Sequence, residues 1–171
     1  MIEIFILSLI QGIAEFLPVS SSSHLIIASD YLELEKSLTI DVSLHIGSFI
    51  AVLVYFYKDI INFYKDKILL FKIIISSIPV MSVGVILVET NLIEKIRNIE
   101  TIAWTTLIFG ILLFVSDKFK IEKTIEKNFS FKSAIFIGSL QILALIPGVS
   151  RSGIAITAAR FLGFERVESA K

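Results

Sequence analysis

A carboxylate, an amide, four consecutive hydroxyls and a histidine occur within one short stretch of an otherwise apolar sequence. Gln11 and Glu15 are four residues apart and would share one face of a helix, and the run from Ser20 to His24 follows closely. An ionisable group at membrane depth is costly, so Glu15 indicates a functional site. A serine needs a nearby base to become a nucleophile, and Glu15 and His24 are the local candidates.

The serine run also suits the binding of an anion. Ser21 and His24 are three residues apart, so their side chains would meet if this turn is helical. Ser20 and Ser22 add hydroxyls beside the backbone N–H groups that begin the next helix, an arrangement typical of phosphate sites. The alternative interpretation is a helix cap, which uses one hydroxyl and leaves the others available.

A second polar cluster, Ser150-Arg151-Ser152-Gly153, interrupts a later apolar block. Its arginine needs a counter-charge, and a guanidinium matches the oxygens of a phosphate bidentately. The alternative is an ion pair between Arg151 and Glu15. Hydroxyls and a glycine in the same turn favour the anion instead. Taken together, an acid, a histidine, hydroxyls and an arginine suit phosphoryl transfer.

The elements that must position these groups are membrane helices. Of the 171 residues, 55% are hydrophobic and the mean hydropathy is +0.85. Basic and acidic residues number 16 each, which argues against a nucleic-acid partner, and the absence of cysteine excludes disulfides and thiol chemistry. We therefore predict an all-α integral membrane protein with a single membrane domain over residues 1–171.

Three segments are long enough to cross a bilayer, which takes about 20 apolar residues. They span roughly residues 41–57, 68–88 and 101–116. Lysines and arginines gather in the second and fourth loops, 58–67 and 117–132, and such residues are retained on the cytoplasmic side. The protein is therefore expected to be multi-pass. A lone histidine in the first crossing, His45, is expected to be a packed residue outside the site.

Two further apolar stretches, 2–32 and 131–164, each break at a proline, Pro18 or Pro147. Such backbone is tolerated at membrane depth where it is buried in protein or lines a water-filled cavity. We predict two re-entrant helical hairpins, which enter from opposite faces because an odd number of crossings separates them. Their similar Gln, Pro and Val-Ser spacing indicates an inverted repeat with a site where the broken helices meet.

Two long motifs resemble the signatures of the undecaprenyl-diphosphate phosphatase family, of the BacA/UppP type. The first is Gln11–His24 and the second is Pro147–Gly153, and further similarity lies at Val42–Ser48, Ile78-Pro79 and Gln141–Leu145. The resemblance covers nearly the whole chain. It implies hydrolysis of a polyprenyl diphosphate to the monophosphate and phosphate, which recycles the lipid carrier for cell-wall synthesis.

The resemblance also implies roles for individual residues. Ser21 is expected to be the nucleophile, His24 the acid/base, Glu15 an essential acid and Arg151 the phosphate-binding group. Mg²⁺ or Ca²⁺ is the implied cofactor, with Glu15 as the candidate metal ligand, and the implied site faces the outside of the cytoplasmic membrane. Further substrate contacts are expected from Gln11, Ser20, Ser22, Ser150, Ser152 and Thr157.

Several features depart from the family pattern. Gln11 stands where the family has an acid, Ser23 replaces a glycine, and Ala155 replaces a threonine, which leaves Thr157 as a nearby hydroxyl. Family members continue into further hydrophobic segments, so the C-terminal part of the family fold is expected to be missing.

Two alternative functions stay open at this point. They are a polyprenyl-phosphate transporter or flippase, and an inactive truncated member of the family. The expected partners are the polyprenyl diphosphate and membrane lipids, with no nucleic acid. A homodimer is among the open assemblies, because the sequence does not fix the oligomeric state.

Overall fold

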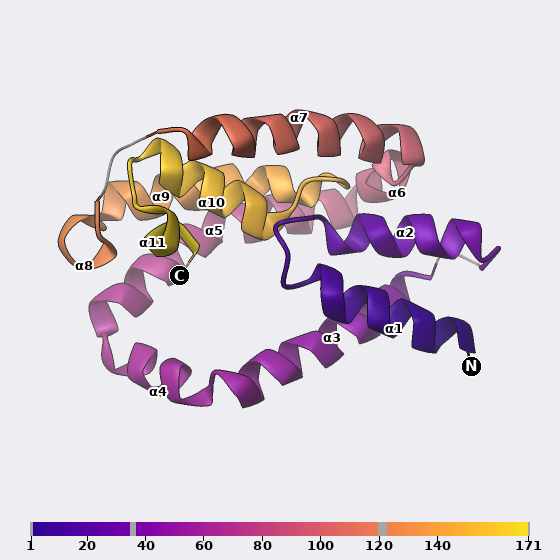
Figure 1. The fold of residues 1–171 in the computed structure, drawn as a ribbon, viewed down its shortest axis with the longest axis horizontal. Helices are drawn as coiled ribbons and strands as arrows, with labels where there is room; N and C mark the ends of the chain where they lie inside the picture. Colours follow the sequence, from indigo (N-terminus) through magenta and orange to yellow (C-terminus); the bar gives the residue numbers. More distant parts are fainter. Residues whose placement is uncertain (1, 35–36, 120–122, 171) are drawn as a thin grey trace.

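The computed structural model describes residues 2–34, 37–119 and 123–170, and these ranges contain helices and no strand (Figure 1). This confirms the predicted all-α class. The elements in chain order are α1 (Ile2–Ala14), α2 (Ser21–Tyr31), α3 (Leu38–Tyr55), α4 (Tyr57–Lys65), α5 (Lys67–Glu89), α6 (Leu92–Ile96), α7 (Ile99–Asp117), α8 (Ile125–Asn128), α9 (Phe131–Leu140), the 3₁₀ turn η1 (Gln141–Leu145), α10 (Arg151–Phe161) and α11 (Arg166–Ala170).

Helices α5 and α7 are long and apolar enough to cross a membrane, with 23 and 19 residues. They coincide with the predicted crossings at 68–88 and 101–116. The third predicted crossing, 41–57, falls largely in α3, whose apolar part Thr39–Tyr55 is shorter. Large apolar side chains on α5 and α7 are exposed, among them Ile78, Val85 and Leu107 at 54%, 61% and 55%. Exposed apolar surface of this kind is typical of contact with lipid.

Side-chain caps set where the two long helices begin. Asp66 precedes α5 and its carboxylate accepts a hydrogen bond from Leu69 N at 3.0 Å. Asn98 precedes α7 and its Oδ1 accepts one from Thr101 N at 2.8 Å. Each cap satisfies a backbone donor that has no partner within the helix.

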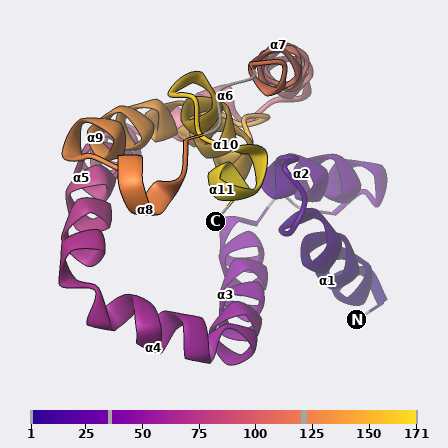
Figure 2. The same ribbon diagram turned by 60° about the vertical axis from the view of Figure 1, so that its left-hand side comes forward.

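Helix α5 packs against α9, and α7 packs against α10. Gly138 of α9 makes the first contact possible, because a Cβ at this position would lie 1.9 Å from the backbone oxygen of Ser76 in α5. Small residues allow such close approach of membrane helices. In Figure 2, α3, α4 and α5 form three sides of an open frame, with α9, α10 and α2 along its upper side.

Both predicted helix breaks are present. Helix α1 ends at Ala14 and α2 begins at Ser21, while η1 ends at Leu145 and α10 begins at Arg151. Helices α1 and α2 lie side by side, and both views show α2 close to α10 (Figures 1 and 2). The two interrupted segments therefore come together, although they are far apart in the sequence.

The other end of α10 is anchored by Arg160, which is only 6% exposed. Its Nη1 donates to the backbone oxygen of Phe164 at 2.7 Å, and its Nη2 donates to the backbone oxygens of Asp117, at 3.0 Å, and Phe119. These bonds satisfy carbonyls at the C-terminal ends of both α7 and α10. The C-terminal end of α10 is thereby fixed on α7, and α10 supports Arg151 at its opposite end.

Candidate active site

The two helix breaks line one cavity of about 370 Å³, a volume within the range of small-molecule sites. The polar lining residues include members of both sequence motifs: Glu15, Ser20, Ser21, Ser22, Ser150, Arg151 and Ser152, together with His45 and Gln141. The structure therefore brings together most of the residues that the sequence analysis singles out. Gln11 lies directly behind the cavity, in contact with Glu15.

Helices α2 and α10 both have their N-terminal ends at this cavity. Ser21 and Ser22 are the first two residues of α2, and Arg151 and Ser152 are the first two of α10. A helix N-terminus has backbone N–H groups without helical partners and carries about half a positive charge. Ser20 precedes α2 but makes no side-chain cap hydrogen bond. A simple cap therefore does not account for the serine run, and an anion in the cavity would face both helix ends.

Arg151 adds a full positive charge to these two helix ends. Its side chain is exposed to the cavity, and it forms no hydrogen bond or ion pair with any residue in the described part of the chain. The alternative of an ion pair with Glu15 is thus not found, because the partners of Glu15 are Gln11, Ser21 and His45. Arg151 therefore has a guanidinium available for a ligand.

Glu15 is the centre of the polar contacts on the opposite wall. Its Oε2 accepts hydrogen bonds from Ser21 Oγ at 2.7 Å and from Gln11 Nε2 at 2.9 Å, and it lies 3.7 Å from His45 Nε2. Gln11 is 2% exposed and its Nε2 also lies 3.2 Å from Ser48 Oγ in α3. The amide of Gln11 therefore orients the carboxylate of Glu15 toward Ser21.

The histidine beside Ser21 is His45, so the prediction that leaves His45 outside the site is wrong. His45 Nε2 lies 3.5 Å from Ser21 Oγ, and His45 Nδ1 lies 2.8 Å from the backbone oxygen of Asp41. A carbonyl partner fixes the proton on Nδ1 and leaves Nε2 as the basic nitrogen facing Ser21. The contact joins α3 to the start of α2, and residue spacing within one segment cannot reveal it.

His24 is placed differently from the expectation for the first motif. Its side chain is exposed, its Nδ1 donates to the backbone oxygen of Ser20 at 2.7 Å, and it is not among the residues that line the cavity. Because residues 21–24 form the first turn of α2, Ser21 and His24 are neighbours on the helix, yet Ser21 Oγ bonds to Glu15. The role that the resemblance implies for His24 stays a prediction.

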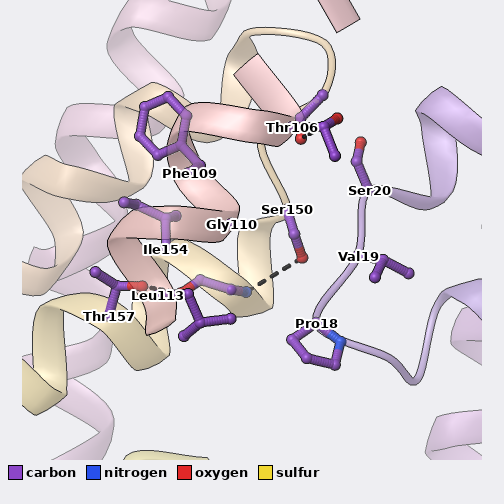
Figure 3. Close-up of a pocket in the computed structure, with 12 residues that line it drawn as sticks. Pro18, Val19, Ser20, Thr106, Phe109, Gly110, Leu113, Ser150, Ile154 and Thr157 are labelled. Carbon is purple, nitrogen blue, oxygen red and sulfur yellow. Dashed lines mark hydrogen bonds between the residues drawn. The ribbon is translucent and has the colours of Figure 1, made fainter. Parts of the chain in front are cut away.

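The remaining hydroxyls divide between two pockets. Ser20 Oγ lies 3.3 Å from Ser22 Oγ, and Ser150 Oγ lies 3.1 Å from Ser152 Oγ, so each motif presents a linked pair of hydroxyls to the polar cavity. Thr157 is buried, and its Oγ1 donates to the backbone oxygen of Gly153 at 2.7 Å. It lines a neighbouring pocket together with Pro18 and Ile154 (Figure 3).

Two threonines of α7, which the sequence analysis does not single out, hold the second break in place. Thr105 Oγ1 lies 2.6 Å from the backbone oxygen of Pro147 and 2.7 Å from that of Thr101 within α7, and Thr106 Oγ1 donates to the backbone oxygen of Gly148 at 3.3 Å. Gly148 has a φ of 96°, and a Cβ there would lie 1.9 Å from Thr105 Oγ1. In the sequence, the only sign of this role is that two adjacent threonines stand in an apolar segment. Irregular backbone at membrane depth needs hydrogen-bond partners of this kind.

The donor groups of the cavity fit a metal ion that is shared with a phosphate. Within the described ranges, no three His, Cys, Asp or Glu side chains are close enough to hold a metal. Glu15 is the one carboxylate among the described residues that line the cavity. Mg²⁺ is usually bound by one or two carboxylates together with substrate phosphates. Among the described residues that line the cavity, Glu15 is the carboxylate that could hold such an ion together with a phosphate.

The family model of the bacitracin resistance protein BacA matches residues 4–171. The undecaprenyl-diphosphatase of Pelagibacter ubique is 51% identical over 99% of this chain and 67% of its own length. The enzymes of that name from Jannaschia sp. and Roseobacter denitrificans are 41% and 40% identical, and the matches cover 98% and 99% of this chain and 68% of each relative. With the apolar helices α5 and α7, this similarity indicates a membrane location. Since the family model and the relatives both match nearly the whole of its length, the chain belongs to the BacA family.

Proposed function

We propose that this chain hydrolyses undecaprenyl diphosphate to undecaprenyl phosphate and inorganic phosphate. The relatives it matches are named undecaprenyl-diphosphatases. The observation that carries the proposal is that Arg151, which has no partner among the described residues, lines the same cavity as Ser21 and the N-terminal ends of α2 and α10. A lipid diphosphate supplies the negative charge that this arrangement lacks.

The contacts of Ser21 support its role as the nucleophile. Ser21 Oγ attacks the terminal phosphorus while its proton passes to Glu15 Oε2, 2.7 Å away. The bond from that phosphorus to the bridging oxygen breaks, and the lipid monophosphate leaves. Water then hydrolyses the phosphoserine to release phosphate and restore Ser21. His45 Nε2, within 3.7 Å of Glu15 and 3.5 Å of Ser21, is the second group in reach of the proton.

Charge neutralisation is the main catalytic demand of phosphoryl transfer. Arg151 and the first N–H groups of α2 and α10 bind the phosphate oxygens, and the hydroxyls of Ser20, Ser22, Ser150 and Ser152 orient them. Mg²⁺ or Ca²⁺, held by Glu15 and the diphosphate, would supply further neutralisation.

We also propose that the segments 2–32 and 131–164 are re-entrant hairpins of an inverted repeat in the cell membrane, with the site open to the outside. The meeting of their two breaks at one cavity supports this arrangement. The lysine-rich segments 58–67 and 117–132 support a cytoplasmic location for the opposite ends of the crossings.

Phosphate release from a C55 polyprenyl diphosphate in detergent tests the proposal. We expect Ser21→Ala and Arg151→Ala each to lower turnover by about 10³-fold, while Ser8→Ala, an exposed serine of α1 that bonds within its own helix, leaves it unchanged. Chelation should stop the reaction and Mg²⁺ or Ca²⁺ should restore it. Full turnover by Arg151→Ala would refute the phosphate-binding role, and lipid flux without phosphate release would indicate a transporter instead.

A further inference from the structure

A second, smaller pocket adjoins the polar cavity and shares Val19, Ser20 and Ser150 with it. Figure 3 shows that it lies between the loop at Pro18–Ser20, one face of α7 and the first turns of α10. Its volume is about 100 Å³. Much of its wall is carbon, from Pro18, Val19, Phe109, Leu113 and Ile154.

The two threonine hydroxyls in this wall donate to the protein, and the two serines lie on the border with the polar cavity. Thr106 Oγ1 donates to the backbone oxygen of Gly148, and Thr157 Oγ1 donates to that of Gly153. Ser150 Oγ accepts from Gly153 N at 3.2 Å, the bond drawn as a dashed line at Ser150 in Figure 3. Ser20 Oγ accepts from Ser23 Oγ at 2.9 Å. Beyond this border the pocket favours an apolar ligand, because its wall is mostly carbon and its threonine hydroxyls already donate to backbone oxygens.

The pocket also reaches the apolar exterior of α7. Gly110 lines it, is exposed, and has no atom within 4 Å of the position that a Cβ would take. Its neighbours on the helix, Leu107 and Ile111, are each 55% exposed. One end of the pocket thus touches the serines of the polar cavity, and the other opens on the surface that α7 presents to lipid.

We propose that this pocket binds the isoprenyl unit directly attached to the diphosphate, and so sets the preference of the enzyme for polyprenyl substrates. The inference rests on the proposed function, which places the diphosphate in the adjoining cavity. The first carbons of the lipid are covalently next to that diphosphate, and the pocket lies between the diphosphate and the lipid-facing side of α7. Apolar contacts there raise the affinity for a diphosphate that carries an isoprenyl chain, and they leave the affinity for a diphosphate without such a chain unchanged.

A variant whose new side chain fills the pocket tests the proposal. Gly110→Phe puts a ring into the open space at the mouth, and Ile111→Phe adds the same ring to the next position of α7, outside the pocket. The substrates are farnesyl diphosphate and methyl diphosphate, with phosphate release by the purified chain in detergent as the readout. We expect Gly110→Phe to lower kcat/KM for farnesyl diphosphate by about ten-fold or more, mainly through KM. Its rate with methyl diphosphate and both rates of Ile111→Phe should stay within about two-fold of the unmodified protein.

The two substrates separate the possible failures. If the unmodified chain releases phosphate neither from these two substrates nor from the C55 polyprenyl diphosphate, the proposed function fails, and if it acts on the C55 diphosphate alone, that substrate replaces farnesyl diphosphate in the comparison. If it does release phosphate and Gly110→Phe has no selective effect on farnesyl diphosphate, the tail pocket is refuted. If Gly110→Phe is inactive on both substrates, Leu113→Ala decides: a raised KM for farnesyl diphosphate alone supports the pocket, and an equal effect on both refutes it.

Discussion

Two arginines of α10 lie at its opposite ends and have opposite surroundings. Arg160 is buried and donates to three backbone oxygens, whereas Arg151 is exposed to the cavity and is unpaired within the described part of the chain. A buried cation that donates to backbone carbonyls is structural, and an unpaired one at a helix N-terminus is available for an anion. On the same helix, Arg160 thus stabilises the fold, whereas Arg151 is available to bind a ligand.

The choice of base is open to a direct comparison of the two histidines. We expect His45→Ala to lower kcat by about 10²-fold, because its Nε2 faces Ser21 and Glu15. His24→Ala should cost less than about five-fold, since its Nδ1 bonds to the backbone oxygen of Ser20 outside the cavity. Phosphate release under substrate saturation measures both, and His45→Gln shows whether a hydrogen-bonding side chain is sufficient. A larger loss from His24→Ala would favour the role that family resemblance implies for it.

The sequence singles out most of the polar residues that line the cavity, because a carboxylate, a serine run or an arginine in an apolar block has few structural explanations. It does not predict His45, Thr105 or Thr106. Their partners, Ser21, Pro147 and Gly148, lie on other segments, so their significance depends on how the helices pack. A single histidine or threonine in an apolar helix carries no such information by itself.

At the scale of elements, one glycine fixes the separation of α5 and α9. We expect Gly138→Ala to lower the free energy of unfolding by about 1–3 kcal/mol, because the new Cβ would clash with the backbone of Ser76. Gly84→Ala is the matched control, since its Cβ would lie 3.8 Å from Leu145 Cδ2, an ordinary contact. Thermal unfolding in detergent compares the two. Equal midpoints for both variants would contradict the close approach.

The helix breaks are the most predictable elements, since Pro18 and Pro147 each interrupt an apolar run. The crossings at 68–88 and 101–116 also correspond closely to α5 and α7. The segment after residue 57 is harder to predict, because the basic stretch that reads as a loop forms α4. Lysines have good helix propensity, and a short amphipathic helix between two apolar ones has no distinct break residue to mark it.

For the whole molecule, the converging positive groups make stability depend on an anion. Two helix N-termini and Arg151 share one cavity, so a bound anion links residues from both halves of the chain. Vanadate or phosphate at about 100 times its Kd should stabilise the fold by about 2.7 kcal/mol, seen as a rise in Tm. Arg151→Ala should remove most of that rise, while Arg97→Ala, which breaks an ion pair with Asp41 elsewhere, should keep it. An identical rise in Arg151→Ala would show that the anion binds elsewhere.

The sequence alone predicts that the two breaks meet, because similar interrupted segments separated by an odd number of crossings suggest a shared site. It does not predict which side chains face one another across the cavity. That outcome depends on glycine-mediated contacts such as Gly138 against Ser76 and Gly148 against Thr105, which set how closely helices approach. Small shifts in these distances would change which side chains Glu15 and Arg151 face across the cavity.

Because α7 holds the loop of the second break through Thr105 and Thr106, the order of synthesis affects assembly. The first break leaves the ribosome early, with Glu15 and four serines in an apolar environment and their later neighbours not yet made. Helix α7, whose threonines contact Pro147 and Gly148, has already been synthesised when that loop emerges. The loop of the second break therefore docks onto a helix that has already been made, whereas the first break has to wait for its partners.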